Sequence, residues 1–239
     1  MQLKVVRIFF FGDSICFGQD VSPHRTWVTR ISEALSETFR AEAEIVVQNP
    51  SINGNTTRMA LERIAYDVQA HRPDVLIVQF GMNDCNVWGT DKGRPRVSPE
   101  AFAANLGEII DRARACGASQ IVIGANHSTT RSITKLPNVS HSYEVANRQY
   151  NTIVREVANK KRARLADLER AFDRSVSAGE HQLADLLLPD ELHLSERGHD
   201  IYFAHYLPIV ESAVAAVLKE RSAPIPNRSF KAIPRTAAD

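Results

Sequence analysis

A serine, a histidine and an aspartate are the residues of this sequence best suited to chemistry on an acyl group. Ser14 ends the triplet Gly12-Asp13-Ser14, and His193 comes three residues after Asp190. A serine hydroxyl is a poor nucleophile until a base takes its proton, and a histidine with an ordinary pKa of ~6.5 can do so near neutral pH. A carboxylate three residues before the histidine can fold back to the ring Nδ1–H and orient it. The triplet alone is weak evidence, because a polar turn after a strand is equally expected.

Three further fragments combine small and polar residues. They are Ser51-Ile52-Asn53-Gly54-Asn55-Thr56, Gly81-Met82-Asn83-Asp84 and Asp190-Glu191-Leu192-His193-Leu194-Ser195. Together with the first triplet, and in this order, they resemble the four sequence blocks of the SGNH hydrolases, also called GDSL esterases. The resemblance runs from Phe11 to about Gly198. Two positions depart from the family pattern, Ile15 in place of leucine and Glu191 in place of glycine; neither replaces a reacting group, so they bear on substrate fit.

The resemblance implies a serine ester hydrolase with Ser14 as nucleophile, His193 as base and Asp190 as the group that orients the base. Attack on an ester carbonyl creates an oxyanion, which needs hydrogen-bond donors fixed in advance. The resemblance supplies three donors: the backbone N–H groups of Ser14 and Gly54 and the side-chain amide of Asn83. Glycine suits position 54, because a backbone amide that approaches the substrate tolerates no bulky side chain. No cofactor is expected.

The elements that must position these residues alternate between strand and helix. β-Branched and aromatic runs predict strands at 5–11, 43–48, 74–80, 120–124 and 164–168. Helical periodicity is found at 27–39, 57–71, 99–116, 144–161 and about 195–220. This order predicts an α/β fold, a three-layer α/β/α sandwich around a five-stranded parallel sheet with the flavodoxin-like order 2-1-3-4-5. Ligands bind beyond the carboxyl ends of such strands, which is where all four fragments lie.

Within the last helix, one face is expected to be apolar. Its members are Ile201, Ala204, Leu207, Val210, Val214 and Val217. These positions suit packing inside the domain as well as a dimer contact, so the oligomeric state stays open.

Two loops at the predicted edge of the sheet, 86–98 and 125–142, give a polar and basic rim. Trp88 and His127 are the candidates for substrate contact, although a solvated loop residue is the alternative for His127. Such a rim argues against long acyl tails, which need a wide apolar trough. It favours a small-molecule ester with a short acyl group, such as acetyl, on a carbohydrate, sugar nucleotide or small metabolite.

Composition narrows the possible partners. The 239 residues are 44% hydrophobic and 24% charged with a net charge of +1, which fits a globular domain and gives no sign of nucleic-acid binding. Purely apolar runs are too short to span a bilayer, so no membrane insertion is expected. The N-terminus is interpreted as mature, because Asp13 interrupts the first apolar run and no small-residue cleavage site follows. The domain is expected to cover 1–221, with 222–239 as an extended tail carrying prolines.

Cysteine and histidine usage points away from metals and disulfides. Cys16, Cys85 and Cys116 are an odd number without a C-x-x-C pair, and histidine–carboxylate spacings typical of a metal site are absent. A reducing, cytoplasmic location fits best. Cys16 is expected to be buried packing, and His199 and His205 to have surface or packing roles.

Two alternatives to hydrolysis remain. The same site passes an acyl group to another alcohol if water is excluded, which would make the protein an O-acyltransferase. A catalytically silent binding module is the other alternative, and the intact set of Ser14, Gly54, Asn83, Asp190 and His193 argues against it.

Overall fold

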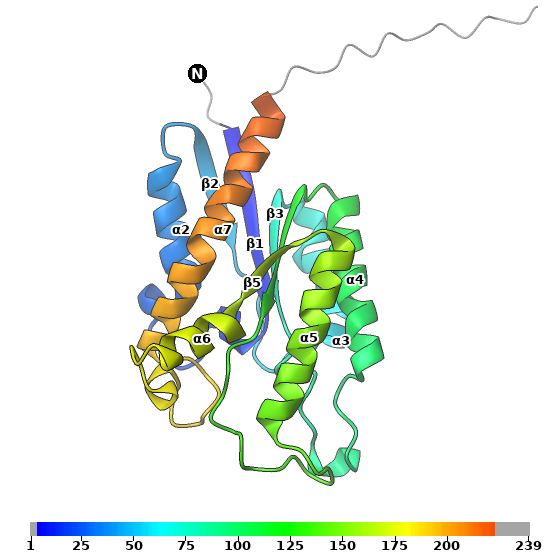
Figure 1. Ribbon diagram of the computed structural model, residues 1–239. Helices are drawn as coiled ribbons and strands as arrows, with labels where there is room; N and C mark the ends of the chain where they lie inside the picture. Colours follow the sequence, from blue (N-terminus) through cyan, green and yellow to red (C-terminus); the bar gives the residue numbers. More distant parts are fainter. Residues whose placement is uncertain (1–3, 223–239) are drawn as a thin grey trace, which may run out of the picture.

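A computed structural model describes residues 4–222 and shows a parallel sheet of five strands (Figure 1). The strand order is β2-β1-β3-β4-β5, which confirms the predicted fold class and order. The strands are β1 (Lys4–Gly12), β2 (Ala43–Gln48), β3 (Val75–Gln79), β4 (Gln120–Ala125) and β5 (Arg164–Asp167). Since all neighbouring pairs are parallel, the carboxyl ends of the strands meet at one edge of the sheet.

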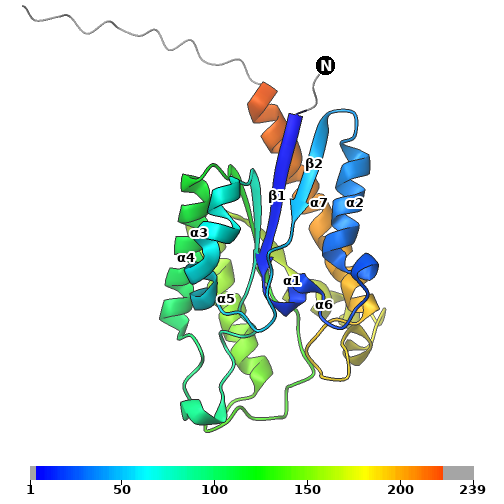
Figure 2. The same cartoon turned by 180° about the vertical axis from the view of Figure 1, so that it is seen from behind.

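Helices cover both faces of the sheet and complete three layers (Figures 1 and 2). One face carries α2 (Trp27–Thr38) and α7 (Glu196–Ser222), with α6 (Leu168–Ser177) beside α7. The other face carries α3 (Thr57–Asp67), α4 (Pro99–Ala115) and α5 (Tyr143–Lys161). A one-turn helix, α1 (Ser14–Phe17), follows β1, and short 3-10 turns occupy Pro23–Arg25, Gln69–His71, Gly89–Asp91 and Leu183–Leu186.

Hydroxyl side chains set the points at which α3, α4 and α5 begin. Thr56, Ser98 and Ser142 precede these helices, and each accepts a hydrogen bond from a backbone N–H three residues later. Such caps satisfy an N–H group that has no partner inside the helix. The loops that follow β2, β3 and β4 therefore end at defined residues. The three helices begin within one residue of their predicted starts.

An aromatic cluster joins the α2 and α7 layer to the sheet. The fully buried Trp27 ring stacks on Tyr206 with the ring centroids 4.5 Å apart and meets Phe10 edge-on at 5.3 Å. Its indole N–H donates to the carbonyl of Ile15 at 2.9 Å. Because Ile15 follows Ser14 in α1, this cluster fixes the floor of the turn that carries the predicted nucleophile.

The helix α6 is absent from the prediction. Asp167, at the end of β5, accepts a hydrogen bond from the backbone N–H of Arg170 and so caps a helix directly after the strand. The buried side chains of Leu168, Ala171 and Phe172 have helical spacing, which is the signal that could have revealed α6.

The predicted apolar face of the last helix is wrong in its first half. Ala204 is exposed and Ile201 and Leu207 are only half-buried, whereas Tyr202 and Tyr206 are fully buried. The tyrosine hydroxyls reach hydrogen-bond partners, His127 for Tyr202 and Gln79 for Tyr206, so these side chains occupy core positions in spite of their polar ends. The second half of the face, Val210, Val214 and Val217, is buried as predicted.

By length and composition alone, α7 would also suit a membrane-spanning helix. In this structure it packs against α2 and the sheet, as the core helix of a globular domain does. The expectation that no part of the chain inserts into a membrane stays a prediction. The predicted tail lies outside the described residues, apart from Ser222, which ends α7, so the domain boundary also stays a prediction.

Candidate active site

The turn after β1 places Ser14 at the carboxyl edge of the sheet. Asp13 precedes α1, and its Oδ1 accepts a hydrogen bond from the backbone N–H of Ile15 at 3.0 Å. This bond stabilises the turn. Ser14 is therefore the first residue of a short helix whose geometry is fixed by its neighbour, and 6% of its surface remains exposed.

Ser14, His193 and Asp190 form a continuous hydrogen-bonded row. Nε2 of His193 lies 2.8 Å from Oγ of Ser14, and Nδ1 of His193 is hydrogen-bonded to Oδ2 of Asp190. An ionised carboxylate only accepts, so Nδ1 carries the proton and Nε2 is left to accept the proton of the serine. The structure thus brings together three residues that the sequence places at two distant points of the chain.

The carboxylate of Asp190 is itself held by the backbone. Its Oδ1 accepts hydrogen bonds from the N–H groups of Leu192 at 3.0 Å and His193 at 2.9 Å. Partial burial acts to raise the pKa of Asp190, but these bonds and the one from the His193 ring outweigh it and hold the pKa below the ordinary value. Asp190 is therefore charged at neutral pH and able to orient the ring.

Gly54 and Asn83 lie in the loops after β2 and β3, beside the turn of Ser14. The side-chain amide of Asn83 donates to Oδ2 of Asp13 at 3.2 Å. Within residues 4–222, the backbone N–H groups of Ser14 and Gly54 donate to no protein acceptor, so both are free for a ligand oxygen. Gly54 has φ of 75°, and a Cβ there would meet no other protein atom within 4 Å. No neighbouring protein atom excludes a side chain here, so the left-handed backbone conformation is the reason why the fold favours glycine at position 54.

Arg96 links these two loops. Its guanidinium donates to Oδ1 of Asn83 at 3.2 Å and to the carbonyl of Gly54 at 3.0 Å. Because a guanidinium only donates, it holds the oxygen of the Asn83 amide toward itself and leaves the NH₂ group to donate to Asp13, the residue before Ser14. Arg96 belongs to the predicted rim loop 86–98, and no sequence signal indicated this bridge.

Two buried carboxyls lie beneath the site. Oδ1 of Asp84 accepts from the N–H and the hydroxyl of Thr57, at the start of α3, whereas its Oδ2 has no partner within residues 4–222. Burial raises the pKa of Asp84 to about 6. Burial likewise raises the pKa of Asp13 to about 7, and the nearby charge of Asp84 acts in the same direction.

The two residues predicted to contact substrate differ sharply in exposure. Trp88 is 53% exposed, and the guanidinium of Arg96 lies 4.5 Å from the centre of its ring. His127 is fully buried, so the prediction that it contacts substrate is wrong. Its ring is hydrogen-bonded to the hydroxyl of Tyr202 and to the carbonyl of Leu192, inside the domain.

The remaining candidates have packing roles. Cys16 is fully buried, as predicted, and burial raises the pKa of its thiol. His199 is buried and accepts a hydrogen bond from the backbone N–H of Trp27, and His205 is half-buried. Residues 4–222 contain no group of three or more histidine, cysteine, aspartate or glutamate side chains that could hold a metal ion.

Comparison with known proteins decides the family. The model of the GDSL-like lipase/acylhydrolase family matches residues 10–201, which include all four loops of the site. The chain belongs to this family. Its membership confirms the resemblance to the SGNH hydrolases drawn from Ser14, Gly54, Asn83 and His193.

Similar curated proteins of this family include esterases. An arylesterase of Vibrio mimicus is 26% identical over 117 residues, which are 49% of this chain and 53% of the relative. Esterase TesA of Pseudomonas aeruginosa is 25% identical over 123 residues, which are 52% of this chain and 56% of the relative. The matches thus span about half the length of these relatives.

Solved structures of the family share the fold. An acetylxylan esterase from Geobacillus stearothermophilus superposes with a TM-score of 0.67 at 22% identity, covering 87% of this chain and 95% of the other. A lipase/acylhydrolase from Enterococcus faecalis superposes with a TM-score of 0.65 at 21% identity, covering 87% and 96%. At this level of identity, the likeness shows the α/β/α architecture alone.

Proposed function

We propose that this GDSL-family protein is a serine esterase that removes a short acyl group from a polar alcohol through an acyl-enzyme on Ser14. The observation that carries the proposal is the 2.8 Å contact between Oγ of Ser14 and Nε2 of His193, in a ring oriented by Asp190. A hydroxyl bonded to a neutral imidazole nitrogen is the arrangement that general-base activation of serine requires. The esterases among its family relatives support the same reaction class.

In the acylation step, Oγ of Ser14 attacks the carbonyl carbon of the ester while Nε2 of His193 takes the hydroxyl proton. The carbonyl oxygen becomes an oxyanion, which the N–H groups of Ser14 and Gly54 and the Asn83 amide stabilise. When the intermediate collapses, the bond to the alcohol breaks and the alcohol leaves with the proton from His193. Asp190 stabilises the imidazolium throughout.

Deacylation repeats these steps with water as the nucleophile. His193 takes a proton from water, the hydroxide attacks the acyl carbon, and the carboxylic acid leaves as Ser14 regains its proton. An alcohol in place of water would give acyl transfer instead.

The rim of the site supports a polar substrate. Trp88 offers an exposed aromatic face, and Lys92 and Arg94 in the same loop are exposed cations. A polar or anionic alcohol, such as an acetylated carbohydrate or a small metabolite ester, suits such a rim better than a long acyl chain. The name of the acetylxylan esterase among the structural neighbours agrees with this class.

Hydrolysis of p-nitrophenyl acetate, butyrate and octanoate by the wild type and by Ser14→Ala tests the proposal. The expected result is turnover that falls with chain length and is lost in Ser14→Ala, with both proteins giving the same circular dichroism spectrum. Turnover that survives in Ser14→Ala would refute Ser14 as the nucleophile. A folded wild type that hydrolyses none of the three esters would favour transfer or binding over general esterase activity.

A further inference from the structure

The loop after β4, residues 126–131, lies between the helices α5 and α6 and the turn that carries Asp190 and His193. Its side chains reach in both directions. His127 and Arg131 point to the turn, and Ser128 and Thr129 point to the helices. This arrangement suggests that the loop does more than connect two elements.

Toward the turn, two side chains of the loop donate to backbone carbonyls. Nε2 of His127 lies 2.8 Å from the carbonyl oxygen of Leu192, the residue before His193. Nε and Nη2 of Arg131 donate to the carbonyl oxygen of Asp190 at 3.1 and 2.6 Å. The two carbonyls belong to the peptide segment that sets where the side chains of Asp190 and His193 point.

The surroundings of His127 fix its protonation state. A carbonyl oxygen only accepts, so Nε2 carries the proton and Nδ1 accepts from the hydroxyl of Tyr202 at 2.7 Å. The ring is fully buried and packs on Phe172 with the ring centroids 5.0 Å apart. Burial lowers the pKa of His127 to about 3, so the ring remains a neutral donor across the pH range in which an esterase works.

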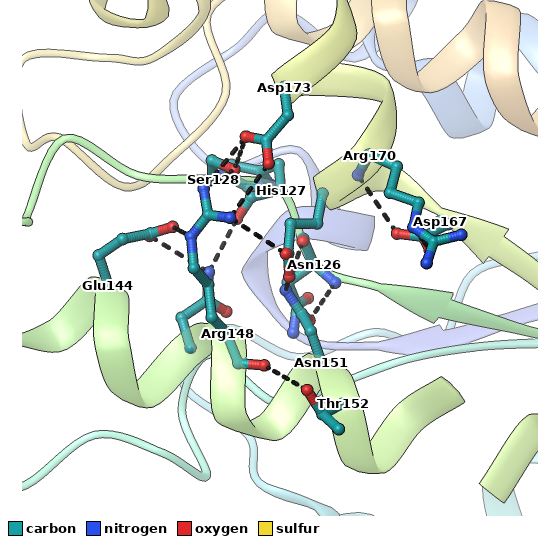
Figure 3. Close-up of polar contacts among 12 residues, drawn as sticks. Asn126, His127, Ser128, Glu144, Arg148, Asn151, Thr152, Asp167, Arg170 and Asp173 are labelled. Atoms are coloured by element: carbon teal, nitrogen blue, oxygen red, sulfur yellow. Dashed lines mark hydrogen bonds and ion pairs between the residues drawn. The ribbon is translucent and has the colours of Figure 1, made fainter. Parts of the chain in front are cut away.

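The other side of the loop is anchored by a network centred on Arg148 of α5 (Figure 3). The Arg148 guanidinium donates to Asp173 of α6, to Glu144 and to the hydroxyl of Ser128, which itself donates to Asp173 at 2.7 Å. Thr129 donates to Glu144 through both its N–H and its hydroxyl at 2.8 Å. Glu144 is buried, Asp173 is half-buried and Arg148 is exposed, and each of the three has several partners, so the network holds this side of the loop at several points.

We propose that His127 and Arg131 are positioning residues, which hold the 190–193 turn at the distance that lets His193 reach Ser14. The proposal rests on the function proposed above and deepens it. Neither residue touches the reacting atoms. A displacement of about 1 Å in a catalytic group costs roughly 10²-fold in rate, so loss of either contact should reduce turnover without weakening substrate binding.

The test compares kcat and KM for p-nitrophenyl acetate in the wild type and four variants. For His127→Ala we expect kcat to fall about 10²-fold with KM within about threefold. His127→Gln places an amide N–H near the position of Nε2, so it should recover most of the loss. Arg131→Ala, at the partly exposed end of the loop, is expected to fold and to lower kcat as well. His205→Gln is the control, because it replaces a half-buried histidine of α7 whose Nε2 has no hydrogen-bond partner within residues 4–222.

A second readout needs no turnover. The far-downfield proton resonance of a histidine Nδ1–H bonded to a carboxylate, assigned by its loss in Asp190→Asn, should persist in His127→Gln and His205→Gln and weaken in His127→Ala and Arg131→Ala. His127→Ala and Arg131→Ala variants that keep both kcat and this resonance would overturn the positioning role. A wild type that neither hydrolyses the ester nor reacts with a fluorophosphonate at Ser14 would refute the esterase, and the resonance would then still decide the positioning.

Discussion

The hydroxyl of Ser14 lies 2.8 Å from Nε2 of His193, although 179 residues separate the two along the chain. The contact exists because Ser14 follows the sheet strand β1, while His193 belongs to a turn that returns to the same edge just before α7. A hydrogen bond of 2.7 Å from the N–H of Leu188 to the carbonyl of His193 closes that turn. The catalytic roles of Ser14, His193 and Asp190 all depend on this contact.

Replacing Asp190 with asparagine should leave the turn intact and stop the chemistry. The asparagine Oδ1 can still accept from the N–H groups of Leu192 and His193, but its NH₂ faces Nδ1 and forces the ring proton onto Nε2. In that tautomer His193 cannot take the Ser14 proton, so kcat is expected to fall by about 10³- to 10⁴-fold. Steady-state kinetics measures the fall in kcat. The control is Asp185→Asn, which removes an exposed carboxylate paired with Arg197 and should leave kcat unchanged.

Removing the Asn83 amide should lower kcat by about 10²- to 10³-fold with little change in KM, because the donor acts on the oxyanion rather than on the bound ester. Arg96→Ala should give a smaller loss, since it frees the Asn83 amide to turn without removing it. Asn86→Ala, in the same loop, is the control, because within residues 4–222 the side chain of Asn86 bonds only to the N–H of Val87. Equal activity of Asn83→Ala and the control would contradict the oxyanion role.

Asp84→Asn should change how stability depends on pH. The folded protein holds a proton on Asp84 up to about pH 6, whereas the unfolded chain releases it near pH 4, so the wild type loses stability from this group as pH rises between the two values. The variant has no charge to bury, and its Oδ1 can keep both bonds from Thr57. The free energy of unfolding of the variant minus that of the wild type should therefore be about 2 kcal/mol larger at pH 8 than at pH 4.5. Urea unfolding at the two pH values measures this difference. A difference that is the same at both pH values would show that Asp84 does not titrate in this range.

Gly124, in β4, should not tolerate alanine. A Cβ there would lie 1.8 Å from Oε1 of Gln79 and 2.0 Å from the hydroxyl of Tyr206, both of which are buried. Relieving such contacts moves core side chains, so the free energy of unfolding is expected to fall by about 3 kcal/mol. Gly89→Ala, where a Cβ would meet nothing within 4 Å, is the matched control, and chemical denaturation of the two variants makes the comparison. Equal stability would mean that the core repacks around position 124 without strain.

From the sequence alone came the fold class, the order of the strands and the prediction that Ser14, Gly54, Asn83, Asp190 and His193 form the candidate site. Each of these depends on local patterns: β-branched and aromatic runs for the strands, helical periodicity for the helices, and short motifs around Ser14, Gly54, Asn83 and His193. The parallel arrangement then forces the loops that follow the strands to one edge of the sheet, so the position of the site follows from the element order.

The tertiary structure decided what surrounds those residues. Nothing local to His127 distinguishes a substrate contact from a buried donor to the carbonyl of Leu192, because its exposure depends on where α6, α7 and the 190–193 turn pack. The same holds for the bridge from Arg96 to Gly54 and Asn83, and for the burial of Tyr202 and Tyr206 at positions where the helical pattern favoured Ile201 and Ala204. Contacts between residues far apart in the chain are set by packing and by the need to satisfy buried polar groups, and neither is written in the spacing of the residues.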